Sequence, residues 1–68
     1  MIEIDARGLS CPEPLMLVDK ALKDHGNDTV KVYLTEVHSK MNVEKFAKNK
    51  GKKVTVRELN QEFELTIE

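Results

Sequence analysis

The residue with the clearest chemical potential is Cys11, the only cysteine among the 68 residues. It lies between a polar turn and two prolines, Pro12 and Pro14, directly before a segment with helical spacing. The thiolate is the nucleophilic form of cysteine, and a helix N-terminus favours an anion because its first amides carry partial positive charge. A free cysteine is often only a small buried hydrophobic residue. The position of Cys11 outside the apolar stripe favours a reactive thiol instead.

The two prolines should fix the direction of this turn. A residue before proline avoids the helical region, so we expect the helix to begin with Pro12 or with Pro14 at its first position. Proline lacks an amide hydrogen, and the amides of Glu13 and Leu15 are then the donors expected to turn toward a sulfur anion. Arg7 should lower the pKa of the thiol and the Glu13 carboxylate should oppose this, so a modest net decrease is expected.

Other uses of a thiol require partners that the sequence does not supply. A thioredoxin-like site needs a second cysteine where Pro14 stands. A metal site needs three or four ligands, and Cys11, His25 and His38 share no ligand spacing. In a catalytic Cys–His pair only His38 is conceivable, because the helix carries His25 about 20 Å away. We therefore expect neither a metal nor a cofactor.

Length and composition limit the remaining functions. A chain of 68 residues forms one domain, residues 1–68, which buries roughly 60% of its unfolded surface and cannot enclose a large substrate pocket. A formal charge of −1 gives no general attraction to nucleic acid or membrane. One cysteine excludes an internal disulfide, and the chain shows no signal peptide or membrane-spanning run. The sequence predicts a cytoplasmic protein whose chemistry takes place at a surface or against a partner.

The hydrophobic pattern predicts the order β-α-β-α-β-β. Four segments alternate between apolar and polar residues, as half-buried strands do: residues 2–7, 30–35, 54–56 and 63–68. Two segments have helical spacing: residues 12–24 before Gly26, and a stretch from a cap at Ser39 or Asn42 to Gly51. Because each strand has one polar side, both helices should cover one face of a mixed four-stranded sheet in a two-layer α/β sandwich. The first two strands should be parallel, with a right-handed crossover, and the last two should form a hairpin.

A resemblance to a known family rests on one motif: Asp5-x-Arg7-Gly8-Leu9-x-Cys11-Pro12-x-Pro14. This CPxP pattern resembles that of the TusA/SirA-like sulfur-carrier family, whose fold has the predicted order of elements. The resemblance implies a sulfurtransferase-type persulfide carrier. Cys11 would accept a sulfane sulfur as a persulfide from a cysteine desulfurase or another sulfurtransferase, and would pass it to an acceptor protein in tRNA thiolation, molybdenum-cofactor synthesis or sulfur oxidation.

The same resemblance implies roles for the neighbours of Cys11. Arg7 and the amides of the first helical turn would stabilise the persulfide anion. Gly8 would allow the loop to approach a partner closely or to adopt a positive φ. Pro12, Glu13 and Pro14 would support the loop geometry.

The second half of the chain is similar to a different branch of the family. The segment Asn42-Val43-x-x-Phe46-Ala47 looks more like the N-terminal domain of YedF-type proteins linked to selenium metabolism. The acidic, proline-containing stretch of carriers in tRNA thiolation is lacking here. The resemblance therefore leaves several pathways open, and the chain could be a fragment of a longer protein.

Six lysines crowd the second helix and its exit: Lys40, Lys45, Lys48, Lys50, Lys52 and Lys53. A solvated helix face is the simplest interpretation. The alternative is a surface, carried by Lys40, Lys45 and Lys48, that docks an acidic partner protein through electrostatic steering. The chain would then be a regulatory or selenium-linked interaction domain. The segment lacks the series of aromatic residues on which single-stranded nucleic acid stacks, so direct binding of nucleic acid is not expected.

Overall fold

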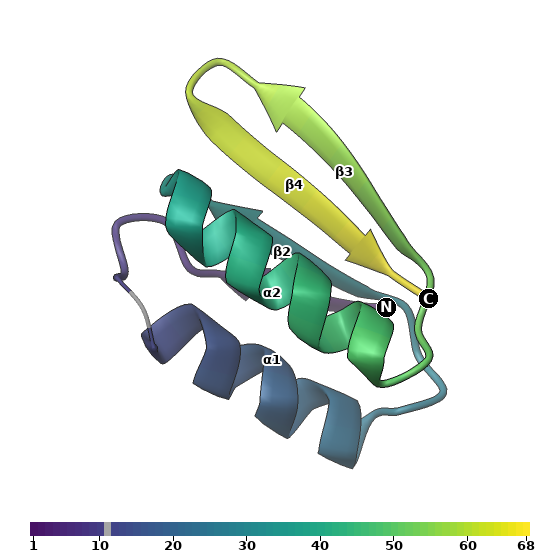
Figure 1. The fold of residues 1–68 in the computed structure, drawn as a ribbon. Helices are drawn as coiled ribbons and strands as arrows, with labels where there is room; N and C mark the ends of the chain where they lie inside the picture. The colour runs from purple at the N-terminus through teal and green to yellow at the C-terminus, as the bar shows by residue number, and fades with distance from the viewer. Residues whose placement is uncertain (11) are drawn as a thin grey trace.

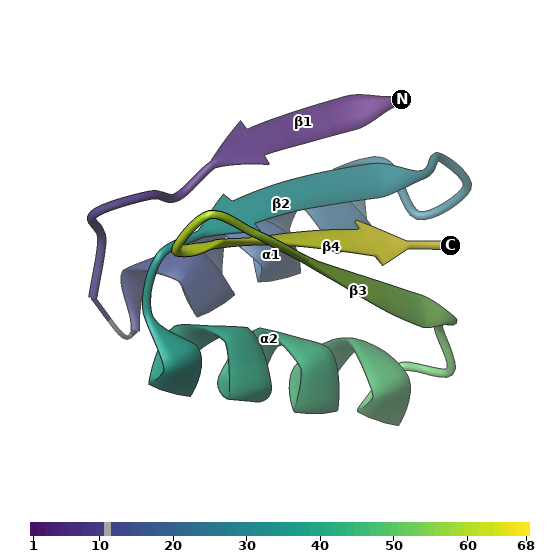
Figure 2. The same ribbon diagram turned by 90° about the horizontal axis from the view of Figure 1, so that it is seen from above.

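The chain folds into a four-stranded sheet covered on one face by two helices (Figures 1 and 2). The computed structural model describes residues 1–10 and 12–68, so Cys11 lies outside the described residues. The elements follow in this order: β1 (Ile2–Asp5), α1 (Glu13–Asp24), β2 (Val30–Leu34), α2 (Val37–Asn49), β3 (Val54–Leu59) and β4 (Glu62–Ile67). The predicted two-layer α/β sandwich is confirmed.

The order of strands in the sheet is β1-β2-β4-β3. β1 pairs with β2 in parallel, and β4 is antiparallel to both β2 and β3. The parallel first pair and the final hairpin therefore agree with the prediction. Because β1 and β2 run in the same direction, the loops that enter α1 and α2 leave the same edge of the sheet (Figure 2).

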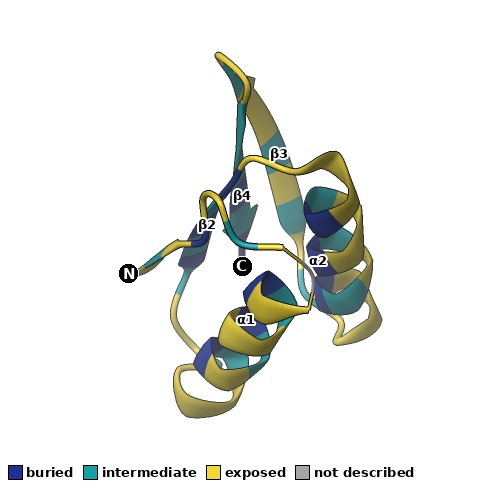
Figure 3. Cartoon of the chain, turned by 90° about the vertical axis from the view of Figure 1, so that its left-hand side faces the viewer, coloured by how far each residue is buried: buried dark blue, intermediate teal, exposed yellow. Residues whose placement is uncertain are grey.

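The core lies between the sheet and the helices, where Figure 3 shows the buried faces in dark blue. Central strands β2 and β4 contribute most of it, since alternate residues from Val30 to Leu34 are fully buried, as are Leu65 and Ile67. Val18 of α1 and Val43 of α2 pack against these residues from the helical layer. The opposite face of the sheet has no helix, and its polar side chains are free to form a surface network.

The start of α1 falls between the two predicted alternatives. Pro12 occupies the N-cap position, Glu13 is the first helical residue and Pro14 is the second. The Pro12 carbonyl already accepts the amide of Met16 at 3.0 Å, which draws the first turn around Glu13. Pro14 is buried and needs no partner for an amide, so the second position costs the helix no hydrogen bond. Each proline was predicted as a possible first helical residue, and both predictions were wrong by one residue. Pro12 lies one position before the first helical residue and Pro14 one position after it.

The predicted cap of α2 was also wrong. The helix begins at Val37 after Glu36, whose backbone is extended and whose side chain makes no capping bond. Ser39 instead lies inside the first turn, 2% exposed, and its hydroxyl has no hydrogen-bond partner among the described residues. Together with Val43 and Ala47 it forms the inward stripe of the helix, so its position is set by packing at the cost of about 1–3 kcal/mol for a buried unpaired hydroxyl. At the other end Gly51 closes α2 with a φ of +80°, as predicted.

Candidate functional site

The backbone of the loop that leads to Cys11 is attached to β2 and to the residue that follows it. The amide of Ala6 donates to the Tyr33 carbonyl at 2.9 Å, and the amide of Gly8 donates to the Thr35 hydroxyl at 3.0 Å. Gly8 has a φ of +80°, one of its two expected properties, and a Cβ there would meet no atom of the described residues within 4 Å. The glycine is therefore required by backbone conformation and not by lack of space.

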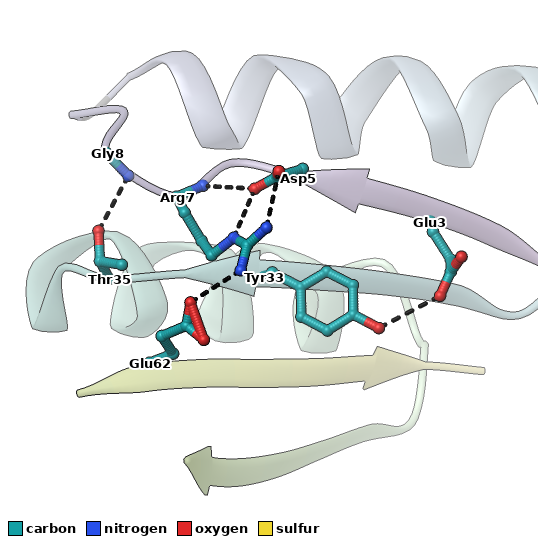
Figure 4. A network of polar contacts seen from close by, with 7 residues as sticks. All are labelled: Glu3, Asp5, Arg7, Gly8, Tyr33, Thr35 and Glu62. Carbon is teal, nitrogen blue, oxygen red and sulfur yellow. Dashed lines mark hydrogen bonds and ion pairs between the residues drawn. The ribbon is translucent and has the colours of Figure 1, made fainter. Parts of the chain in front are cut away.

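Arg7 forms the centre of a polar network at the start of this loop (Figure 4). Its Nε and Nη2 donate to the two carboxylate oxygens of Asp5 at 2.9 and 3.0 Å, and its Nη1 donates to Glu62 Oε1 at 3.0 Å. The guanidinium also lies 6.0 Å from the centre of the Tyr33 ring. The hydroxyl of Tyr33 in turn donates to Glu3 at 3.2 Å. The network thus joins the beginning of the loop to strands β1, β2 and β4.

These contacts shift the pKa values of their partners. Hydrogen bonds from the Arg7 side chain, and to a smaller extent the bond from its amide, lower the pKa of Asp5 from 3.8 to about 2. In return, the carboxylates of Asp5 and Glu62 raise the pKa of Arg7. A lowered pKa in the folded state means that Asp5 stabilises the fold above pH 3.8 and that this contribution is lost as the pH falls toward about 2. Desolvation and the bond to Glu3 raise the pKa of Tyr33. Asp5 and Arg7 are therefore both charged at neutral pH, whereas the Tyr33 hydroxyl keeps its proton.

The Arg7 side chain lies over the face of the sheet that has no helix. Its partners Asp5, Tyr33 and Glu62 all point from that face (Figure 4), whereas α1 and α2 cover the other (Figure 2). Two carboxylates oppose its single positive charge. Its expected action on a sulfur anion stays a prediction.

The beginning of α1 differs from expectation in one hydrogen bond. The sequence predicted the amide of Glu13 as a donor to a sulfur anion. In the structure this amide donates to the Ser10 carbonyl at 3.1 Å instead. Ser10, Pro12 and the Glu13 side chain are exposed, whereas Pro14 is buried against the core. Cys11 lies outside the described residues, so its predicted reactivity and pKa stay predictions. Its two neighbours in the chain nevertheless lie at the surface.

The two histidines are exposed. His25 follows the last residue of α1, with Nδ1 3.9 Å from a carboxylate oxygen of Asp28, and His38 lies in the first turn of α2. In the part of the chain that the structure describes, no three His, Cys, Asp or Glu side chains converge as metal ligands would.

The predicted lysine cluster does not form one uniform patch. Lys40 lies 5.5 Å from the Phe63 ring, and Lys48 pairs with Glu44 at 3.0 Å. Lys52 donates to the Gly26 carbonyl at 2.6 Å and thereby ties the exit of α2 to the end of α1. Lys45 is exposed on the outer side of the helix. An open depression on this side is lined by α2 alone: Met41, Asn42, Glu44, Lys45, Lys48 and Asn49.

Sequence reasoning missed the partners that hold the loop. Glu62 is 55 residues from Arg7 and Thr35 is 27 residues from Gly8. A charged residue at the start of a strand and a threonine at the end of another carry no local signal of these contacts. Only the strand order β1-β2-β4-β3 brings them to the edge from which the loop leaves.

Fold and site together define a class of small α/β protein. A loop held by hydrogen bonds of Arg7 and Gly8 leads to the only cysteine of the sequence, directly before the first helix. The chain belongs to the TusA family: the family model described as "Sulfurtransferase TusA" matches residues 2–68. It is therefore a sulfur-transfer protein, with donors and acceptors of sulfur as its general partners.

A solved structure supports the same assignment. The crystal structure of a SirA-like protein from Desulfitobacterium hafniense is similar to the chain with a TM-score of 0.92 and 36% sequence identity, over 98% of this chain and 95% of that one. No curated protein matches the chain. Within the described ranges, neither α1 nor α2 has the length and hydropathy that a membrane-spanning helix requires.

Proposed function

We propose that this chain is a sulfur carrier that accepts a sulfane sulfur as a persulfide on Cys11 and relays it to an acceptor protein. The observation that supports this most strongly is the CPxP motif, in a chain that matches the sulfurtransferase family over residues 2–68. Exposure of Ser10 and Pro12 on either side of Cys11 is consistent with access by a visiting protein.

The transfer step follows thiol–disulfide chemistry. The thiolate of Cys11, after loss of its proton to solvent, attacks the terminal sulfur of the donor's persulfide. The new bond joins Sγ to that sulfur, the donor's sulfur–sulfur bond breaks, and the donor leaves as a thiolate. One sulfur–sulfur bond replaces another, so no outside oxidant or reductant is required. The acceptor repeats the exchange in the next step.

The size of the protein explains why it would need partners on both sides. A domain of 68 residues cannot surround a substrate, so donor and acceptor must supply the surroundings of the reaction. We propose a cysteine desulfurase or another sulfurtransferase as donor and a thiol protein as acceptor, in a reducing cytoplasm that keeps Cys11 free. Neither a membrane nor a nucleic acid is needed for this function.

Loading of the protein can be measured directly. After incubation with a cysteine desulfurase and cysteine, we expect the intact mass to increase by one sulfur atom, with the added atom on Cys11 after digestion. Protein alkylated beforehand at its only thiol should gain nothing. The absence of any adduct with several different donors would contradict the proposal. Supplying selenocysteine in a parallel reaction tests the selenium branch, which predicts preferential loading of selenium.

We also propose that the outer side of α2 contacts an acidic partner protein. Lys45 supports this because it is exposed beside the open depression of α2, although the ion pair of Lys48 with Glu44 reduces the charge there.

Lys45→Glu is expected to slow loading several-fold at low salt, with a smaller effect at high salt, because exposed charges steer association and are screened by ions. Lys53→Glu, an equal charge reversal at an exposed position beyond α2, is the matched control and should change the rate less. Equal effects of the two variants would mean that the net charge of the protein sets the loading rate, and would contradict a docking surface on α2. In the alternative function, an interaction domain, Lys45→Glu would abolish partner binding and Cys11→Ser would have no effect.

A further inference from the structure

The polar network around Arg7 suggests a role that its position in the motif does not reveal. We propose that Asp5, Arg7 and Glu62, here called the Arg7 clasp, position the loop of Cys11, and that Arg7 serves sulfur transfer through loop geometry and not through its charge on the sulfur. This inference rests on the carrier function proposed above, since it names the residues that present the thiol.

The clasp spans three strands. Asp5 ends β1 and Glu62 begins β4, while β2 lies between them. Neighbouring strands are about 4.8 Å apart, so the contact bridges about 10 Å across the sheet. The planar guanidinium reaches both ends because two of its nitrogens bracket Asp5 and a third faces Glu62. A lysine has one nitrogen at that position and cannot reproduce this fork.

The clasp acts on a segment that is already attached on both sides. Arg7 stands between Ala6, bonded to Tyr33, and Gly8, bonded to Thr35. Those two bonds hold the backbone to β2 and to Thr35 directly after it, and the clasp adds a third attachment to β4. The chain reaches Cys11 four residues after Arg7. The clasp opposes rotation of the segment around its two backbone bonds, and we expect such a rotation to displace the residues that follow in the chain.

Electrostatics argues against a direct action of Arg7 on the sulfur. One positive and two negative side chains leave the clasp with a net charge of −1, and the Arg7 side chain is 48% exposed, so solvent screens its field. Glu3 adds further negative charge, since it contributes to the raised pKa of Tyr33, whereas the charge of Glu64 is offset by Lys31. A surface of this sign does not stabilise a second anion.

The two roles of Arg7 predict opposite results for Glu62→Gln. If the clasp positions the loop, Glu62→Gln and Arg7→Lys should each lower the kcat/KM of sulfur loading roughly tenfold, as small misplacements of reacting groups do. The pKa of the Cys11 thiol, measured by the pH dependence of iodoacetamide alkylation, should stay unchanged. If the charge acts on the sulfur, Glu62→Gln should lower the thiol pKa and speed loading, and Arg7→Lys should behave as wild type. Either of these last results would overturn the inference.

A second measurement separates the clasp from the carrier function. Hydrogen exchange at the amides of Gly8 and Leu9 should be faster in Glu62→Gln than in wild type, since both amides are bonded within the attached segment. Glu64→Gln is the matched control, because Glu64 is also an acid of β4 but pairs with Lys31 at 3.9 Å outside the clasp. Unchanged exchange in Glu62→Gln would refute the clasp. A wild-type protein that fails to load would refute the carrier function alone, and the exchange rates would still decide the clasp.

Discussion

Replacing Cys11 by serine is expected to abolish sulfur loading and relay, with no residual rate above that of the protein-free reaction. A serine hydroxyl stays protonated at neutral pH, whereas the cysteine thiol supplies the nucleophilic anion. No other thiol in the sequence can substitute, since Cys11 is the only cysteine. The change replaces one sulfur by one oxygen between the exposed residues Ser10 and Pro12. The free energy of unfolding should therefore remain within about 0.5 kcal/mol of wild type.

The loading assay with a radiolabelled sulfur donor, followed by chemical denaturation, measures both parts of this prediction. Ser10→Ala is the control, because it alters the exposed neighbour of Cys11 and should load at the wild-type rate. Transfer that persists in Cys11→Ser would mean that the sulfur is carried elsewhere or not at all by this chain. Loss of transfer together with a large loss of stability would leave the chemical role of the thiol unsupported.

The fold was predictable because each strand carries its own alternation. Val30, Val32 and Leu34 are separated by polar residues, and the structure buries these three while leaving Lys31 and Tyr33 on the open face. The length of β3 was not predictable in the same way. Alternation breaks after Val56, yet the strand continues to Leu59 because its pairing with β4 holds Arg57 and Glu58 in the ladder. Backbone pairing, which sequence patterns do not display, extends the strand.

The start of α2 shows a second limit. Serine is a preferred cap, and this made Ser39 the natural candidate. The helix had already begun at Val37, however, and Ser39 occupies the stripe that packs inward. Propensity assigned the residue to a helix end, while packing of Val43 and Ala47 placed it inside. Tertiary contacts thus overrode a local preference.

The candidate site likewise contains residues that a local motif reveals and residues that only the folded sheet brings together. Cys11 and the two prolines are neighbours in sequence, so a local motif reveals them. Glu62 and Thr35 contribute contacts only after the sheet has formed, and their distance in sequence hides them. Local chemistry was therefore readable from the chain, whereas the residues that hold it in place were not.

Leu65→Ala is expected to remove most of the stability of the fold. Leu65 is fully buried on β4, between Val32 of β2 and Val56 of β3, where it joins the two halves of the sheet. Truncation of a buried leucine costs about 2–5 kcal/mol, because the lost contacts leave a cavity. A protein of 68 residues has a total stability of only roughly 3–10 kcal/mol. The variant should therefore unfold at a much lower denaturant concentration, or be partly unfolded in buffer.

The matched control is Leu17→Ala, the same truncation on the outer part of α1, where the side chain is 40% exposed. It should cost less than about 0.5 kcal/mol, as substitutions at exposed sites usually do. Equal losses in the two variants would contradict the placement of the core between the sheet and the helices. Because β4 also supplies Glu62, unfolding around Leu65 would release one end of the Arg7 clasp. Loading by Leu65→Ala should then decline with its folded fraction or faster, which links the central strand to presentation of the thiol.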